Sequence, residues 1–269
     1  MNSPVGNKQV ALSIVIPAYN EEKRLPQSMD RVVAFAEKRG GPTEIIVVND
    51  GSRDDTANVV RRYMGGALNV RLLENPGNRG KGYAVRHGAL RASHDWVLIT
   101  DADLSTPIED VEKLITATRV HNADVAFGSR ALDRKLVAVH QSAAREISGR
   151  VFNLAVRMMT QLPYSDTQCG FKLYSREAAQ LIFSMQRLDG FGFDVEDLYI
   201  AKRLGFRAKE VPVRWANVEG SKVSLMSSMK AFVEVAYVRW SALTGHYADA
   251  DVPVYRNPSP AKRLQRRTQ

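Results

Sequence analysis

VVNDGSRDDT (residues 47–56) and VLITDADLSTP (residues 97–107) are the two stretches that decide the predicted fold. Each begins as an apolar run and then stops at carboxylates and turn-forming residues. Apolar runs that do not alternate with polar residues are typical of strands buried on both faces, as in a parallel sheet covered by helices. The chain therefore places acidic side chains where its buried strands end.

The same alternation of strands and helices extends outward from these stretches. We expect strands at residues 11–17, 44–48, 70–73, 96–100 and 125–128, and helices at 26–39, 54–64, 81–92 and 107–120. In the second half we expect helices at 142–160, 176–184 and 194–204, and strands at 171–174 and 207–215. The pattern predicts an α/β fold with a mostly parallel sheet and helices on both faces.

Length and composition fit one compact domain with an appendage. The chain has 269 residues, of which 44% are hydrophobic and 25% charged, an ordinary balance for a globular protein. Its single cysteine, Cys169, excludes an intrachain disulfide and fits a reducing compartment. We find no signal peptide and no run of about 18 uncharged apolar residues. We therefore expect a cytoplasmic protein.

Polar residues follow three of the expected strands. The first strand is followed by Pro17, Tyr19, Asn20 and Glu21, the second by Asn49 and Asp50, and the fourth by Asp101 and Asp103. The carboxyl ends of parallel strands share one edge of a sheet, and open α/β sheets bind ligands there. These side chains are therefore expected to line one site.

Asp101 and Asp103 predict a metal site. Side chains two residues apart on extended backbone point to the same side, and two such carboxylates repel unless a cation compensates them. Mg²⁺ and Mn²⁺ prefer oxygen ligands, and Mg²⁺ leaves positions for phosphates and water. The alternative is that both carboxylates cap the helix after Pro107.

Two further features point to a nucleotide. Asp50 adds an acceptor on the same edge for ribose or base hydrogens, and Tyr19 can stack on a base. The stretch NPGNRGKGYAVRHG (residues 75–88) sets glycines around Arg79 and Lys81 before a helix, whose N-terminus favours anions. It fits neither the Walker pattern nor the dinucleotide pattern, and the alternative is a plain turn between strand and helix.

These motifs in order resemble the signatures of family 2 glycosyltransferases. The matching segments are SIVIPAYNEE, IIVVNDGSRDDT, NRGKGYAVRHG, DADLSTP, FGSR and DTQCGFKLY, within residues 12–223. The resemblance implies the GT-A (nucleotide-diphospho-sugar transferase) fold and inverting transfer of a sugar from a nucleotide-sugar with Mg²⁺ or Mn²⁺. DTQCGFKLYSREAA, GFGFDVEDLYIAKRLGF and EVPVRWANVEGSKVS most resemble the dolichyl-phosphate β-glucosyltransferases, within the polyprenyl-phosphate branch.

The resemblance also implies roles for individual residues. The donor-binding residues would be Pro17, Tyr19, Glu21, Asp50, Lys81, Asp101 and Ala102. Asp103 would be the main metal ligand and a catalytic residue, with Asp101 and Ser105 as further ligands. Mannosyl relatives usually carry glutamine where Ser105 stands, which weakens a mannosyl assignment.

Basic residues are expected to hold phosphate. The candidates are Arg130, which closely follows the fifth strand, and then Arg145, Arg150 and Lys222. By resemblance, Arg130 and Lys222 contact the acceptor or donor phosphate, and the loop at 221–222 closes over the nucleotide. Arg130 is also expected to be a catalytic residue, together with Asp103. For each arginine the alternative is a solvated surface charge. Mannosyl relatives carry arginine where Ala216 stands, so any role for the nearby Arg214 is doubtful.

The acceptor decides whether a base is needed. A phosphate monoester is mostly dianionic at neutral pH and can attack without losing a proton, so we expect none. A hydroxyl acceptor would need a carboxylate base, for which Asp194, Glu196 or Asp197 is the candidate. The alternative for these three, and for Asp166, is helix capping and surface charge.

Residues 224–247 predict an amphipathic helix. Its apolar side carries Leu225, Met229, Phe232, Val233, Ala236, Tyr237, Trp240 and Leu243, and its polar side Ser227, Lys230, Glu234 and Ser241. It either lies in a membrane interface, on the inner face of the membrane, or packs on the core. Residues 248–269 form a basic tail that we expect to be disordered, within a net charge of +9. It fits an anionic membrane or a role in solubility, and no motif suggests nucleic acid.

The sequence thus predicts a metal-dependent inverting hexosyltransferase with a catalytic domain at residues 1–223. Its reaction would move glucose from UDP-glucose to a polyprenyl phosphate and give the β-linked product. The alternatives are GDP-mannose as donor, a glycan hydroxyl as acceptor, and a nucleotide-sugar sensor without catalysis.

Overall fold

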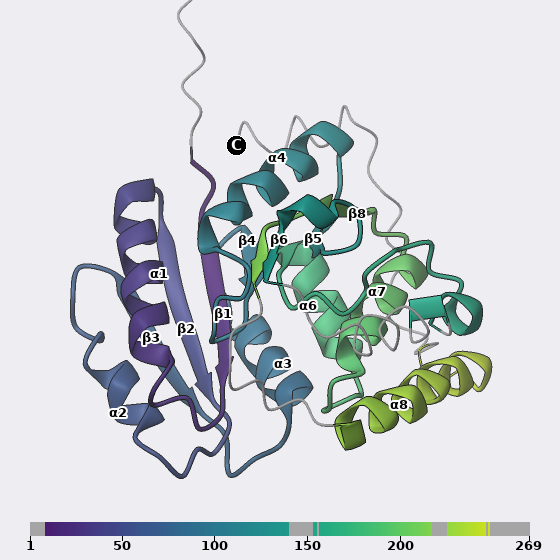
Figure 1. The fold of residues 1–269 in the computed structure, drawn as a ribbon, viewed down its shortest axis with the longest axis horizontal. Coiled ribbons are helices and arrows are strands. Elements are labelled where there is room, and N and C mark those ends of the chain that lie inside the picture. The colour runs from purple at the N-terminus through teal and green to yellow at the C-terminus, as the bar shows by residue number, and fades with distance from the viewer. Residues whose placement is uncertain (1–8, 140–152, 155, 217–224, 246, 248–269) are drawn as a thin grey trace, which may run out of the picture.

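The computed structural model describes residues 9–139, 153–154, 156–216, 225–245 and 247. Its main sheet has seven strands in the order β3-β2-β1-β4-β7-β5-β8 (Figure 1). The strands are β1 (Leu12–Ala18), β2 (Thr43–Asn49), β3 (Asn69–Glu74), β4 (Trp96–Ile99), β5 (Val125–Ser129), β7 (Lys172–Ser175) and β8 (Ala208–Pro212). β7 runs antiparallel to β4 and β5, whereas the other neighbours are parallel. The mostly parallel sheet is confirmed.

Helices cover both faces of this sheet, as expected. One face carries α1 (Leu25–Arg39), α2 (Thr56–Arg61) and α4 (Val111–His121), and the other α3 (Lys81–Arg91), α6 (Arg176–Met185), α7 (Phe193–Arg203) and α8 (Leu225–Leu243). Successive β1 side chains serve the two cores alternately, because Ile14 and Ile16 pack with the first group and Val15 with the second. The central part of β1 is therefore apolar on both of its faces.

Three boundaries differ from expectation for local reasons. The strand expected at 207–215 divides after Pro212, which has no amide hydrogen to donate, and β9 (Trp215–Ala216) pairs instead with β6 (Val137–Val139). Pro107 does not open a helix, because its ψ of 137° is extended and a 3₁₀ turn η1 (Ile108–Asp110) precedes α4. The helix expected at 54–64 is shorter in the structure, because α2 covers only Thr56–Arg61 and no side chain caps its start.

A second 3₁₀ turn, η2 (Arg134–Leu136), precedes β6. The helix expected at 142–160 falls largely outside the described residues.

Where its side chains are described, α8 does not pack on the core with the apolar row predicted from the sequence. Val235 and Val238 are buried in the core with α3, α6 and α7, and so are the polar Glu234 and Ser241. The exposed side instead carries Val233 (70% exposed), Tyr237 (37%), Trp240 (52%) and Leu243 (69%). The side chains of Leu225, Met229, Phe232, Ser227 and Lys230 lie outside the described part of the chain. Two residues of the predicted polar side, Glu234 and Ser241, therefore face the protein interior.

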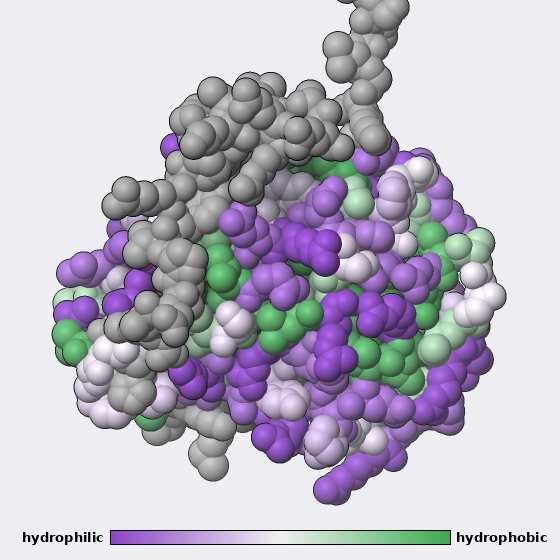
Figure 2. Space-filling view, turned by 180° about the vertical axis from the view of Figure 1, so that it is seen from behind, coloured by the Kyte–Doolittle hydropathy of each residue, from purple (hydrophilic) through white to green (hydrophobic). Residues whose placement is uncertain are grey.

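One face of the molecule is mainly polar where the described residues form it (Figure 2). Figure 2 shows a face on which hydrophilic residues predominate and hydrophobic ones form small separate patches. Within the described residues, every helix is too short or too polar to cross a membrane.

Candidate active site

The ends of β1, β2 and β4 meet at one edge of the sheet and place the predicted side chains together. Parallel pairing aligns β1 with both other strands, and the amide of Asp50 donates to the carbonyl of Ala18 at 2.8 Å. The segments that follow β1 and β2 then interlock, because the amide of Asn20 donates to the Ser52 hydroxyl at 2.9 Å. The shared edge predicted from the sequence is therefore present.

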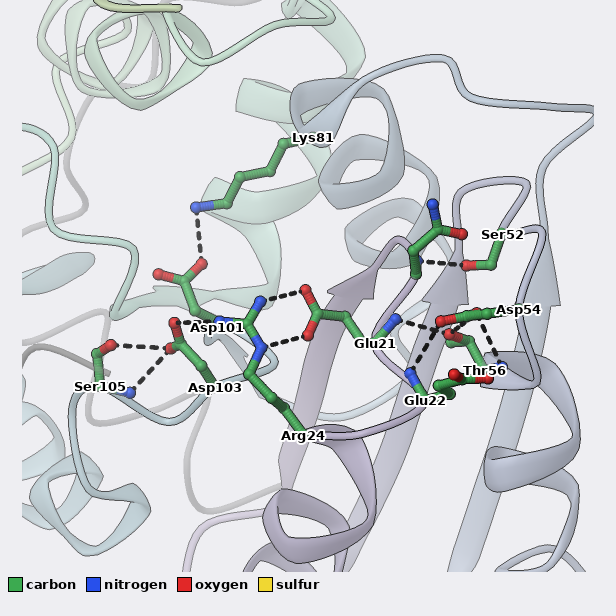
Figure 3. A network of polar contacts seen from close by, with 11 residues as sticks. Glu21, Glu22, Arg24, Ser52, Asp54, Thr56, Lys81, Asp101, Asp103 and Ser105 are labelled. Carbon is green, nitrogen blue, oxygen red and sulfur yellow. Dashed lines mark hydrogen bonds and ion pairs between the residues drawn. The ribbon is translucent and has the colours of Figure 1, made fainter. Parts of the chain in front are cut away.

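Asp101 and Asp103 form the acidic centre of this edge (Figure 3). Asp101 forms an ion pair with Lys81, with 2.7 Å between Oδ1 and Nζ. Asp103 Oδ1 accepts from the Ser105 amide at 3.0 Å and from its hydroxyl at 2.9 Å. The other oxygen of Asp103 lies 3.8 Å from Arg24 Nη1. Two cations thus offset the charge of two adjacent, partly exposed carboxylates.

The chemistry of this donor set fits a divalent cation. Asp101, Asp103 and Ser105 offer oxygen atoms only, which Mg²⁺ and Mn²⁺ prefer. Within the described residues no group of three or more acidic, histidine or cysteine side chains is arranged to hold a metal by itself. A pair of carboxylates is nevertheless the number that Mg²⁺ commonly takes from a protein when phosphates complete its shell.

Glu21 is fixed by a residue that our sequence analysis missed. Its carboxylate accepts from Arg24 Nε at 2.7 Å, and its amide donates to the Thr56 hydroxyl at 2.8 Å. Glu21 is buried, and the pair brings the Arg24 guanidinium up to the acidic centre. The spacing of three residues at the start of a helix is the signal that could have indicated this pair.

Asp50 is buried and supports the glycine-rich loop. Its carboxylate accepts from the Asn75 side chain at 2.7 Å and from the amides of Arg79 and Gly80 at 3.1 and 2.8 Å. Gly80 has a φ of 109°, and a Cβ there would lie 2.3 Å from the carbonyl oxygen of Asp189. The loop therefore needs glycine at this position, and Asp50 orients the N-terminus of α3.

Lys81, the first residue of α3, points from that terminus toward Asp101 (Figure 3). Its ammonium lies 6.0 Å from the ring centre of Phe191 and 5.8 Å from that of Phe193. Burial by itself lowers the pKa of Lys81, but the carboxylates of Asp101 and Asp194 raise it above its ordinary value. Lys81 therefore stays protonated and can hold an anion here.

The DTQCGF motif (residues 166–171) lies against the acidic centre. A Cβ on Gly170 would lie 2.4 Å from an oxygen of the Asp101 carboxylate. Cys169 is buried, and burial together with the charge of Asp166 raises the pKa of its thiol to about 12. The motif therefore acts on the site by close packing, and the thiol stays protonated.

Arg130 is held in place by Asp166. The guanidinium donates from Nε and Nη2 to the two carboxylate oxygens at 2.6 and 2.8 Å, and it stacks on Trp215 at 5.6 Å. Burial raises the pKa of Asp166, but the charge and hydrogen bonds of Arg130 lower it by more than burial raises it. The net pKa of Asp166 is therefore below its ordinary value. Asp166 is thus no surface charge. Arg145 and Lys222 lie outside the described residues, as do Arg150 and Ser221.

The three carboxylates of the FDVED segment are buried, so the alternative that they are surface charges does not hold. Lys172, which is also buried, lies 2.8 Å from Asp194 and 3.0 Å from Asp197. Tyr174 donates to Asp197 at 2.6 Å, and burial raises the pKa of Asp197. Glu196 accepts from backbone amides. The contacts of Glu196 and Asp197 therefore indicate a structural role. Asp194 is linked to the site because its charge raises the pKa of Lys81.

The other predicted positions are placed as follows. Pro17 is a partly exposed residue of β1, Tyr19 is half-buried just after it, and Ala102 is buried in the turn between the two acidic residues. Arg214 donates to Asp110 at 2.6 and 2.9 Å and takes no part in the acidic centre.

Comparisons with known proteins agree with these observations. A family model described as Glycosyl transferase family 2 matches residues 13–183. The Dolichyl-phosphate beta-glucosyltransferase of Homo sapiens is 38% identical over 247 residues, which cover 87% of this chain and 76% of the human protein. Dolichyl-phosphate beta-glucosyltransferase ALG5D of Trichomonas vaginalis is 37% identical over 236 residues, 84% of this chain and 72% of that protein.

A solved structure has a similar fold. It is glucosyl-3-phosphoglycerate synthase from Mycobacterium tuberculosis in complex with UDP, with a TM-score of 0.64 and 19% identity, covering 89% of this chain and 86% of that one. The similarity confirms the predicted GT-A fold.

Proposed function

The chain belongs to glycosyl transferase family 2, and on that basis we propose that it transfers glucose from UDP-glucose to a dolichyl-type polyprenyl phosphate. Relatives named dolichyl-phosphate beta-glucosyltransferase are 33% to 41% identical across most of the chain. The single observation that carries the proposal is the acidic pair, Asp101 and Asp103, set among Lys81 and Arg24 at the strand ends. The product would be the β-linked polyprenyl-phosphate glucose.

We assign the donor to the edge formed by β1, β2 and β4. Asp101, Asp103 and Ser105 would hold Mg²⁺ or Mn²⁺, which supplies positive charge to the departing diphosphate. Lys81 adds a further cation beside the same carboxylate. The nucleoside would lie near Pro17 and Tyr19. Asp50 and Glu21 act on the donor through the elements that they fix, because their carboxylates already accept hydrogen bonds from protein groups.

We assign the acceptor phosphate to the Arg130 side of the site. Asp166 fixes the guanidinium and Trp215 supports its face, which leaves it oriented for an anion. A dianionic phosphate attacks without a base, so positioning and charge compensation suffice. The burial and pairing of Glu196 and Asp197 agree with this, because a base would need access to a hydroxyl. Arg145 and Lys222 stay proposals from the family resemblance.

We further propose that the enzyme binds the membrane peripherally through α8. An exposed row of Val233, Tyr237, Trp240 and Leu243 is suited to lie at headgroup depth. The basic tail at 248–269 would add attraction to anionic lipid. Flotation with anionic liposomes at low salt tests this. Binding should fall at least tenfold in the Val233→Ser, Trp240→Ser double variant, and unchanged flotation would refute the role of α8.

A donor screen tests the proposed reaction. UDP-glucose, UDP-galactose and GDP-mannose are each offered with a short prenyl phosphate, with Mg²⁺, with Mn²⁺ or with a chelator. We expect transfer from UDP-glucose in the presence of metal and an anomeric β linkage by NMR. Transfer to a glycan hydroxyl but not to prenyl phosphate would overturn the acceptor assignment. Nucleotide binding without transfer to either would indicate a sensor.

A further inference from the structure

α8 reaches into the catalytic part of the molecule through Glu234. This carboxylate is buried, and its Oε2 accepts from the amide of Gly192 at 2.6 Å. The same side chain fills the space beside two glycines, because a Cβ on Gly190 would lie 2.1 Å from Oε1 and one on Gly192 would lie 2.5 Å from the Glu234 Cβ. The segment at 187–193, which joins α6 to α7, therefore rests directly on α8.

A second carboxylate fixes the other end of this segment. Glu196 accepts from the amides of Arg187 and Leu188 at 2.9 and 2.8 Å. Its Oε1 also accepts from the hydroxyl of Tyr247 at 2.7 Å, and that tyrosine follows α8 and is buried. Glu234 of α8 thus holds one end of the segment directly, and Tyr247 supports the other end through Glu196 of α7.

The opposite side of the segment supports the proposed donor site. The carbonyl of Asp189 accepts from the amides of Gly82 and Tyr83 at 2.8 and 3.3 Å, in the first turn of α3. The rings of Phe191 and Phe193 flank the Lys81 ammonium. The segment therefore sets the position of both the helix terminus and its lysine.

We propose that Glu234 is a positioning residue for nucleotide-sugar binding and that α8 is an integral part of the donor site. The inference rests on the proposed function. A carboxylate 42 residues from Gly192 in sequence holds the segment that orients Lys81, so its loss frees the segment locally. α8 thus exposes apolar side chains on its outer side, while Glu234 on its inner side supports the donor site.

The test measures UDP affinity by calorimetry in the full chain, with Mn²⁺ present. Glu234→Ala removes the acceptor and should weaken binding about tenfold and raise the donor KM more than it lowers kcat. Glu234→Gln retains an acceptor oxygen and should stay within about threefold of the wild type. Tyr247→Phe should cause a smaller loss. Glu37→Gln, which removes an exposed carboxylate from α1, is the matched control and should change nothing.

Hydrogen exchange provides a readout that does not depend on activity. In Glu234→Ala, peptides covering 79–86 and 187–193 should exchange faster, while those covering β2 and β3 should not. Unchanged exchange and UDP affinity in this variant overturn the proposal, as does an equal loss in Glu234→Gln. If Glu234→Ala does not fold, Tyr247→Phe decides by the same two measurements. A wild type that binds no nucleotide counts against the proposed function, and the exchange result still judges the positioning role.

Discussion

Gly170→Ala offers a sharp test of the acidic centre. A Cβ at this position would lie 2.4 Å from an Asp101 oxygen, whereas ordinary contacts begin at 3.4 Å. The carboxylate must therefore move by about 1 Å, which breaks its 2.7 Å ion pair with Lys81. A misplacement of this size in a positioned group can cost about a hundredfold in rate. We expect kcat/KM to fall by about ten- to a hundredfold.

The fold should tolerate the same change. The clash involves the partly exposed end of a short side chain that can rotate away, and Gly170 does not occupy the left-handed region of backbone conformation. The free energy of unfolding should therefore change by less than about 1 kcal/mol. Transferase rates with a short prenyl phosphate and urea unfolding measure the two quantities separately.

Gly66→Ala is the matched control for this prediction. There the nearest atom to a new Cβ is the Tyr63 carbonyl oxygen at 3.9 Å, an ordinary contact. Its kinetic constants should equal those of the wild type. Wild-type kcat/KM in Gly170→Ala would show that the position of the Asp101 carboxylate does not matter, and the reasoning would fail.

Three further predictions concern the site and its supports. Asp103→Asn should lower the transfer rate at least a hundredfold at any metal concentration. A rate near that of the wild type would refute the role of Asp103 as a metal ligand. Lys172→Met leaves two buried carboxylates without their cation and should cost about 3–5 kcal/mol of unfolding free energy in urea titrations. Burial raises the pKa of Asp110, but hydrogen bonds from Arg214 outweigh this effect, so the net pKa of Asp110 lies below its ordinary value. Its stabilisation is therefore complete above about pH 4 and is lost as pH falls through the folded-state pKa, so the stability gap to Asp110→Asn should narrow in acid.

The sheet and its acidic edge could be predicted from the sequence because both depend on local patterns. Apolar runs mark the strands, and parallel strands bring their ends together whatever the connecting helices are. The antiparallel insertion of β7 between β4 and β5 had no local signal, because strand direction is decided by the path of the chain. The GT-A fold followed from the motifs.

The buried charges were not predictable in the same way. Lys172 and Asp197 are 25 residues apart, and neither sequence neighbourhood shows that the other exists. Asp194 and Glu196 look like the acidic first turn of an exposed helix until their partners are known. The orientation of α8 was left open for a related reason, because its hydrophobic periodicity predicts an apolar side but not which side meets the protein. Tertiary contact with Gly192 places Glu234 inward.

The inward placement of Glu234 affects where the chain can be divided or exchanged. A truncation at residue 223, where the family resemblance ends, would remove the acceptor of the Gly192 amide and leave the core without Val235 and Val238. Exchanging residues 224–247 between relatives would likewise transplant a piece of the catalytic edge along with a surface helix. Chimeras that preserve a glutamate at position 234 and small residues opposite it should therefore tolerate a new outer row, and those that change both sides should not.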